Sequence, residues 1–459
     1  MADDIGTTSL SERIGQALIG LGLLAVLALV ISVATSTPVD RRYPDREPVY
    51  FWHMWTGEWK DEVDKIVDAF NKSQETYEVV ALSIPAAGGA MSKFLLGVAG
   101  GDPPDVMAQW DSVIPNWAEA GLLQPLDGLM SPQKWEELRR EMYPAARRIG
   151  MYKDRLYGVT IGLNIWACYY RPDHLREVGL DPDAFPQTLE ELSEWGRKLN
   201  RFDDRGNLIR MGFLPGNWIH MALAAGGRFY DWEKDVLYLN TPDNVRSLRW
   251  LYEERARLGF DNVVRFRAGL NEGGYAQAWG FMSGAYSICV DGQWRVEQIR
   301  KYRPDLEYRT APIPPRAEGG RKLASWSNGN FMIIPRGAKN VPGAWEFVKF
   351  WSGIEHPERA AEFYTMGGWL PITPAVAEAP FYQKYLRDNP QFRTFLEVLA
   401  SENVEPTPPV PYQVMLLDSI NRADDRTMRG AVTPEEALAR LQAEVEQEIA
   451  RRRELGYAD

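Results

Sequence analysis

The chain has 459 residues, too many for one ordinary hydrophobic core, so two or three domains or lobes are expected. A formal net charge of −11, without a dominant cluster of Lys and Arg, disfavours a nucleic-acid partner. Aromatic residues are frequent: 17 Trp and 20 Tyr supply flat, amphipathic surfaces that suit ligands with apolar faces and polar edges.

The amino-terminal segment is apolar. Residues 14–39 carry no charge, and residues 17–33 are almost purely Leu, Ala, Val, Ile and Gly. This run is longer than the apolar part of a typical signal peptide and close to the ~20 residues that span a bilayer. We expect one uncleaved transmembrane helix that anchors the protein in the cytoplasmic membrane. A cleaved signal, cut at the small residues 33–36, is the alternative.

After a Pro-containing linker at residues 37–48, strand and helix patterns alternate. The predicted elements are a strand at 48–55, a helix at 58–73, a strand at 77–84, a helix at 91–98, a strand at 105–109 and a helix at 112–120. The helix at 58–73 is expected to carry one apolar face, formed by Trp59, Val63, Ile66, Val67 and Phe70. This alternation is typical of a parallel sheet covered by helices.

Beyond residue 120 the pattern is less regular. The expected elements are an extended run at 157–170, a helix at 189–199 capped by Thr188 and Glu191, a helix at 242–258, a strand at 285–290, a loop at 312–320, a strand at 331–334, a helix at 344–351, an aromatic turn at 367–371 and a final helix that starts at Thr433, Pro434 and Glu436.

Aromatic and acidic side chains follow several of these strands. Trp52 and Trp55 close the first strand, Trp110 and Asp111 follow the third, and a turn carrying Asp291, Gln293 and Trp294 follows the strand at 285–290. Open α/β sheets bind ligands in the crevice outside the carboxyl ends of their strands, which indicates a binding site here. The alternative for each Trp is packing in the core, where this residue is usually well buried.

Two cysteines and four histidines give no sign of a metal site. Cys168 and Cys289 lie far apart in apolar runs, so we expect two buried free thiols, with a single disulfide as the alternative. The histidines lack the i,i+3 or i,i+4 spacing of a metal site on a helix. No metal and no cofactor are predicted.

The order of these segments resembles family 1 of the extracellular solute-binding proteins of carbohydrate ABC transporters, the group that contains maltose-binding protein. The segments that carry the resemblance are YFWHMWTGEWKDEVDKIVDAFNKS, GDPPDVMAQWDS, LYGVTIGLNIWACYYRPDHL, FMSGAYSICVDGQW, APIPP, SWSNGNFMIIPRGAKNVPGAWEFVKFWSG and TPEEALARLQAEVEQEI. They run from about residue 47 to 450. The amino-terminal span departs from the family, in which a cleaved signal or a lipidated Cys is usual.

The resemblance implies an α/β, two-lobed type II periplasmic-binding-protein fold with a hinged cleft between the lobes. The chain would cross between lobes near residues 160–163, 325–329 and 370–374. Residues 1–46 would form the tail, membrane helix and linker. Lobe 1 would then comprise residues 47–161 and 327–370, and lobe 2 residues 162–326 and 371–459.

The resemblance also implies a set of residues that line the ligand. These are Trp52, Trp55, Trp110, Asp111, Trp218, Asp291, Trp294, Trp326, Asn328 and Trp369. A sugar presents C–H faces that aromatic rings cover and hydroxyls that carboxylates and amides bind. Trp294 and Trp110 are the expected stacking residues, and Asp291 and Asp111 the expected hydroxyl acceptors.

The implied function is the extracytoplasmic binding component of an ABC importer, which takes a sugar or oligosaccharide into a closing cleft and presents it to a permease. Two alternatives remain. A membrane-tethered sugar sensor would need a signalling partner. A glycoside hydrolase would need two carboxylates about 5–10 Å apart, a role that Asp111 and Asp291 could fill, but no catalytic motif supports an enzyme.

Overall fold

The computed structural model describes residues 41–85, 89–270 and 276–457. The predicted membrane helix at residues 14–39 lies outside these ranges, and within them no helix has both the length and the apolarity to cross a bilayer. Residues 41–46 belong to a separate small unit, in which the Arg46 N–H donates to the Tyr43 carbonyl. All elements below belong to the second unit, Glu47–Asp459.

The first part of this unit follows the predicted alternation of strand and helix. Its elements are β1 (Glu47–His53), α2 (Gly57–Ser73), β2 (Tyr77–Ser83), α3 (Ala90–Ala99), β3 (Val106–Trp110), η2 (Asp111–Val113), α4 (Ile114–Glu119), η3 (Asp127–Leu129), α5 (Pro132–Glu141) and α6 (Pro144–Arg148). Strands β1, β2 and β3 pair in parallel, as expected. Helix α2 buries Val63, Ile66, Val67 and Phe70, the predicted apolar face, toward the core.

The middle of the chain contains the long strand β6. The elements are β4 (Met151–Tyr152), β5 (Arg155–Leu156), β6 (Gly158–Tyr170), α7 (Pro172–Glu177), α8 (Leu189–Leu199), β7 (Arg201–Phe202), β8 (Leu208–Leu214), α9 (Trp218–Met221), β9 (Tyr230–Asp231), β10 (Val236–Leu237), α10 (Pro242–Leu258), α11 (Phe260–Gly269), η4 (Ala276–Ala278), α12 (Gly280–Ser283) and β11 (Tyr286–Gly292). All thirteen residues of β6 are buried, in agreement with the extended run predicted there.

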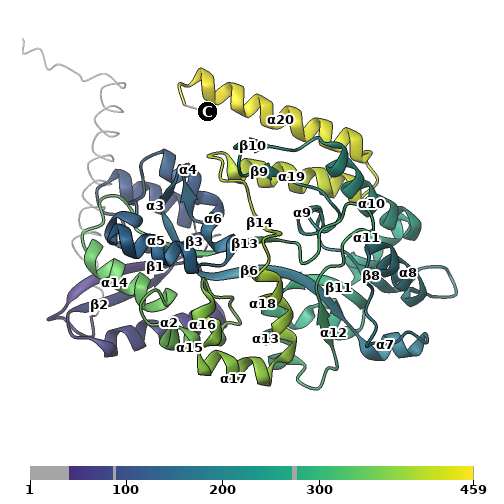
Figure 1. Cartoon of the computed structure of the whole chain (residues 1–459), viewed down its shortest axis with the longest axis horizontal. Helices are drawn as coiled ribbons and strands as arrows, with labels where there is room; N and C mark the ends of the chain where they lie inside the picture. The colour runs from purple at the N-terminus through teal and green to yellow at the C-terminus, as the bar shows by residue number, and fades with distance from the viewer. Residues whose placement is uncertain (1–40, 86–88, 271–275, 458–459) are drawn as a thin grey trace, which may run out of the picture. The chain divides into compact units, whose positions relative to one another are not determined.

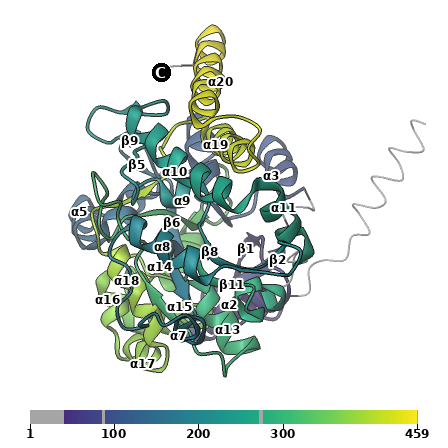
Figure 2. The same ribbon diagram turned by 90° about the vertical axis from the view of Figure 1, so that its right-hand side faces the viewer.

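The last part is mostly helical. It comprises α13 (Trp294–Tyr302), β12 (Arg309–Ala311), β13 (Ser325–Ile333), α14 (Val341–Ser352), α15 (Pro357–Met366), α16 (Pro374–Glu378), α17 (Pro380–Asp388), η5 (Pro390–Phe392), α18 (Arg393–Leu399), β14 (Val404–Pro406), α19 (Gln413–Met428) and α20 (Pro434–Glu454). Helices α19 and α20 lie side by side in both views (Figures 1 and 2).

Strands β6 and β13 connect two groups of strands in one ten-stranded sheet, in which eight strands follow the order β2-β1-β3-β13-β6-β11-β8-β7. The other two are β12, which pairs with β6, and β14, which pairs with β13. Helices α2 and α14 pack beside β2 and β1, and α8 packs beside β8 (Figure 1). Strand β13 pairs with β3 on one side and with β6 on the other, and β6 pairs further along with β11. A bridge between Leu163 and Leu370 brings a third segment to the same place.

Three local predictions need correction. Strand β11 runs through Asp291 and Gly292, which pair with Ala167 and Trp166, so the turn predicted there is a direct passage from strand to helix. Strand β13 begins at Ser325 rather than at residue 331, because the polar segment before Phe331 pairs with β6. The Thr188 hydroxyl caps α8, but the Glu191 carboxylate accepts from the Gln187 N–H, so the box is incomplete.

Both cysteines are free and buried, which confirms the expectation of free thiols. Cys168 on β6 lies opposite Val290, and Cys289 on β11 lies opposite Tyr169. Successive residues of a strand point to opposite faces, so the two thiols lie on different sides of the sheet and belong to different hydrophobic clusters.

Candidate functional site

One face of the β6–β13 pair gathers amide and aromatic side chains. Side chains two residues apart on a strand share a face. Gly162, Asn164 and Trp166 of β6 therefore lie on the same face, in that order along the strand. Asn164 lies opposite Asn328 of β13, and Trp326 lies two residues before Asn328. Alternation along two paired strands therefore builds one continuous polar and aromatic face.

A relay of amides holds the centre of this face. The Gln293 amide donates to Asn164 Oδ1 at 2.9 Å and to the Leu163 carbonyl at 3.1 Å, and its own oxygen accepts from the Ile165 N–H at 3.0 Å. Asn164 Nδ2 in turn donates to Asn328 Oδ1 at 2.8 Å. Among the described residues, nothing accepts a hydrogen bond from the half-buried Asn328 amide nitrogen, so this donor is available to a ligand.

An aromatic group lies at the Trp166 end of the relay. The ring of Trp166 stacks on His220 with centroids 4.3 Å apart, meets Trp326 at 4.9 Å and meets the edge of Trp294 at 5.7 Å. Burial lowers the pKa of His220 to about 3, so this imidazole is neutral at neutral pH. The result is an uncharged aromatic surface in which Trp294 stays half-buried.

A second aromatic group lies at the Gly162 end. Trp369 contacts Gly162, where an added Cβ would come 3.1 Å from the indole ring. The ring centroids of Trp55 and Trp59 lie 6.2 and 6.0 Å from the ring centroid of Trp369. Gly162 and Trp166 are four residues apart on an extended strand, so the two aromatic groups are separated by roughly 13 Å along β6.

Asp111 forms no ion pair of 4.0 Å or less with a described residue. Its Oδ1 accepts from the Gly329 N–H at 3.3 Å, and burial raises its pKa to about 7. A space of about 10 Å³ adjoins Asp111 and is also lined by Arg148, Thr407 and Gln413, whose Oε1 has no partner in the described chain. This volume holds about one water molecule.

Asp291 is arranged differently. Its Oδ2 pairs with the Arg295 guanidinium at 2.9 Å, one helical turn along α13, and its Oδ1 accepts from the Gly292 N–H. Arg295 also lies over the ring of Trp279, 4.4 Å from its centroid. The two predicted carboxylates thus differ in charge environment: Asp111 is buried without an ion pair, and Asp291 is neutralised by one.

The structure brings together six of the predicted lining residues in and beside the β6–β13 face. These are Trp55, Asp111, Trp294, Trp326, Asn328 and Trp369. Trp218 instead is fully buried, with its indole N–H donating to Ser247 and its ring against Phe229. Trp52 is half-buried against the core, and Trp110 at the end of β3 is 41% exposed.

Sequence reasoning missed Asn164, Trp166 and His220 as members of the face. The signal for the first two was present: they stand two residues apart in the run predicted as extended, and so share a face. His220 carries no such signal, because it reaches Trp166 only through the fold.

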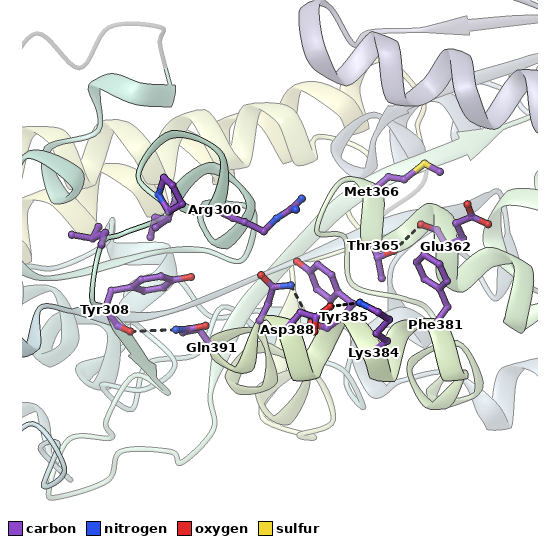
Figure 3. Close-up of a pocket in the computed structure, with 14 residues that line it drawn as sticks. Arg300, Tyr308, Glu362, Thr365, Met366, Phe381, Lys384, Tyr385, Asp388 and Gln391 are labelled. Carbon is purple, nitrogen blue, oxygen red and sulfur yellow. Dashed lines mark hydrogen bonds and ion pairs between the residues drawn. The ribbon is translucent and has the colours of Figure 1, made fainter.

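A cavity of about 540 Å³ lies elsewhere, between α13, α15 and α17 (Figure 3). Its polar groups already bond to one another, as when Lys384 pairs with Asp388 and Gln391 donates to the Tyr308 carbonyl. None of the predicted ligand-lining residues borders it. We therefore place the candidate site on the β6–β13 face.

Comparison with known proteins shows the family of this chain. The model of the bacterial extracellular solute-binding protein family matches residues 65–393, well over half of the chain. The chain belongs to this family. Membership confirms the family resemblance found in the sequence and the two-lobed α/β fold that it implied.

Individual relatives of this solute-binding protein are distant. The sn-glycerol-3-phosphate-binding periplasmic protein UgpB of Escherichia coli (strain K12) is 21% identical over 377 residues, covering 79% of this chain and 81% of that protein. The solved structure of CpMnBP1 with mannobiose bound has a TM-score of 0.73 and 26% identity, and covers 87% of this chain and 99% of that one. The cyclic alpha-maltosyl-1,6-maltose binding protein from Arthrobacter globiformis has a TM-score of 0.71 and 21% identity, with 87% and 98% covered.

Proposed function

We propose that this solute-binding protein is the extracytoplasmic component of an ABC importer and that its ligand is a sugar or oligosaccharide. The observation that carries the proposal is the β6–β13 face: an amide relay with a free donor at Asn328, with a group of indole rings at either end. Rings cover the apolar faces of a sugar, and amides bind its hydroxyls. The mannobiose bound by CpMnBP1 has the same chemistry.

The proposed lobes are residues 47–161 with 327–370, and 162–326 with 371–459. Contacts between them support a closed arrangement. Glu119 of α4 pairs with Arg452 of α20, Glu58 of α2 pairs with Lys301 of α13, and Asn116 donates to the Pro411 carbonyl at 3.0 Å. The space of about 10 Å³ beside Asp111 is too small for a sugar ring. Ligand entry to Asp111 therefore requires the lobes to separate, and closure around the ligand would be the signal for the permease.

The site is proposed to bind without reacting. A retaining or inverting glycosidase needs one carboxylate as nucleophile or base and another as acid. Asp291 lies opposite Ala167 in the strand pair, so its side chain points to the other face of β6 from Asn164 and Trp166 and does not face a sugar bound on the β6–β13 face. A sugar that stays chemically intact after prolonged incubation with the protein is the expected result, and chromatographic detection of hydrolysis products would contradict it.

Glycerol phosphate is the second candidate ligand, because UgpB is named for it. A phosphate would need an available cation near the face. Arg295 is committed to Asp291, and Arg148, which borders the space beside Asp111, lies over the ring of Trp232 at 5.1 Å. The neutral aromatic surface around Trp166 favours an uncharged sugar over this anion.

Residues 14–39 are proposed to anchor the protein in the cytoplasmic membrane, on the strength of their uncharged, apolar sequence. Mass spectrometry of the protein purified from membranes tests this directly. An intact amino terminus is expected, and a mature form that begins near residue 36 would show that the segment is a cleaved signal.

A ligand screen tests the proposed function. Tryptophan fluorescence of the protein is titrated with mannobiose, maltose, monosaccharides and sn-glycerol 3-phosphate, and affinities are then measured by calorimetry. We expect a saturable response to at least one neutral sugar. If only sn-glycerol 3-phosphate bound saturably, it would replace the sugar as the proposed ligand. The absence of a response to any sugar would contradict the proposal that the ligand is a sugar.

A further inference from the structure

A separate cavity of about 300 Å³ lies away from the β6–β13 face, among α8, α10 and strands β7 and β8. Phe202, Met211, Phe213, Pro215 and Leu258 contribute apolar walls. The volume is at the lower end of the range for small-molecule sites, which is about 300–1,000 Å³.

Arg255 of α10 borders this cavity and is only 4% exposed. Its guanidinium makes no hydrogen bond or ion pair of 4.0 Å or less within the described ranges, and its enclosed Nε is among the buried atoms without a partner. The terminal nitrogens are not enclosed in this way, and Arg255 is one of the residues that line the cavity. A buried cation without a bonded partner is costly, which is a reason to look for an anion that it binds.

The charges around the cavity are unequal. Arg197 and Arg257 also line it, but Arg197 pairs with Glu194 at 4.0 Å and Arg257 pairs with Glu254. Asp424 of α19 attracts Arg255 from further away but forms no ion pair with it; its Oδ2 accepts from the Trp218 N–H. The cavity thus combines an apolar wall with Arg255, a lining cation that forms no ion pair within the described ranges.

We propose that this cavity is a second ligand site, which binds a small organic carboxylate: the carboxylate on Arg255, and an aliphatic or aromatic body against Phe202, Phe213 and Met211. A bidentate bond from the guanidinium satisfies donors that the protein leaves open. The inference is independent of the sugar site, since none of these residues belongs to the β6–β13 face.

The test uses the whole protein and calorimetric or ligand-observed NMR titration with hexanoate and benzoate. Benzyl alcohol has the aromatic body without the charge, and sulfate has the charge without the body. We expect both carboxylates to bind with dissociation constants on the order of 1 mM or tighter, and both controls to bind at least tenfold more weakly. Sulfate that binds as tightly as the carboxylates would overturn the proposal in favour of an inorganic-anion site.

Variants locate the site. Arg255→Met should weaken hexanoate binding at least tenfold, and Arg255→Lys, which keeps the charge, should weaken it less. Phe202 is 47% exposed, so Phe202→Ala tests the apolar wall without threatening the fold; a several-fold loss is expected. Phe381→Ala is the control, because Phe381 is similarly exposed at 49% but lines the cavity at α17. Unchanged hexanoate affinity in Phe202→Ala and in a folded Arg255 variant would overturn the proposal.

Discussion

At the scale of the residue, environment separates tryptophans that look alike in sequence. Trp294 follows strand β11, stays half-buried and meets Trp166 by its edge, so part of its ring can contact a ligand. Trp218 follows a Pro-Gly turn, but its ring is enclosed and its N–H is bonded to Ser247. The first is suited to binding, and the second stabilises the core.

Substitution should separate these two roles. Trp294→Ala is expected to weaken sugar binding tenfold or more with little effect on unfolding, because a stacking surface is lost. Trp218→Phe should leave affinity unchanged but lower the free energy of unfolding by about 1–3 kcal/mol, since the Ser247 hydrogen bond and buried volume are lost. Calorimetry and urea denaturation measure the two effects. The assignment fails if the two variants exchange these phenotypes.

Asp111 should make stability depend on pH. Its pKa is raised by burial to about 7 in the folded protein, against an ordinary value of 3.8, so the folded state holds this proton more tightly. The resulting stabilisation is present below pH 4 and is lost as the pH rises to about 7. It amounts to about 4 kcal/mol at most.

The measurement is urea denaturation of the wild type and Asp111→Asn from pH 4 to pH 8. The free energy of unfolding of the wild type relative to the variant should fall across this range. Asp424, whose pKa burial raises to about 6, is present in both proteins and cancels in the difference. If the free energies of unfolding of the two proteins changed in parallel with pH, the pKa of Asp111 would not be raised in the folded state.

At the scale of the element, the junction between β11 and α13 positions Trp294. Strand pairing continues to Gly292, and the helix begins at Trp294 after a single residue. The indole ring lies directly over Gly292, where a Cβ would come 2.0 Å from it. Glycine at this position is therefore what allows the ring to turn back toward Trp166.

Gly292→Ala should displace the Trp294 ring and weaken sugar binding about as much as Trp294→Ala does. The double variant should be little worse than either one, because both remove the same contact. Gly269→Ala is the control, since a Cβ there meets nothing within 4 Å. Additive losses of affinity in calorimetry would mean that Gly292 acts by some route other than Trp294.

At the scale of the whole molecule, β6 and β13 contribute residues to both hydrophobic clusters, as do β8 and β11. The pair between Glu119 and Arg452 joins helices at opposite ends of the sequence, and both side chains are only 12% exposed. If the proposed lobes move, this pair favours the closed form and thereby raises the apparent affinity for ligand.

Arg452→Met should lower sugar affinity several-fold and raise the radius of gyration measured by small-angle X-ray scattering without ligand, because the closed form loses a partly buried ion pair. Arg429→Met removes an arginine whose partner, Asp425, is also largely exposed, so it should change neither quantity. If the two variants had the same sugar affinity and the same radius of gyration, the ion pair between Glu119 and Arg452 would not contribute to closure.

The sequence alone determined the order of strands and helices between residues 47 and 120, the amphipathic face of α2, the extended run of β6 and the family. These depend on periodicity and on the chain order of short segments, which are local properties. It also placed Trp294 directly after a strand and Trp369 in a turn, where only their immediate neighbours in the chain were needed.

Tertiary structure decided which of these residues meet. The Trp166–His220 stack, the relay from Gln293 through Asn164 to Asn328, and the exclusion of Trp218 from the face all join segments more than 25 residues apart. The same holds for the pKa of Asp111, which is set by burial. Contacts of this kind depend on strand register and on packing between distant segments, and no local pattern in the sequence encodes them.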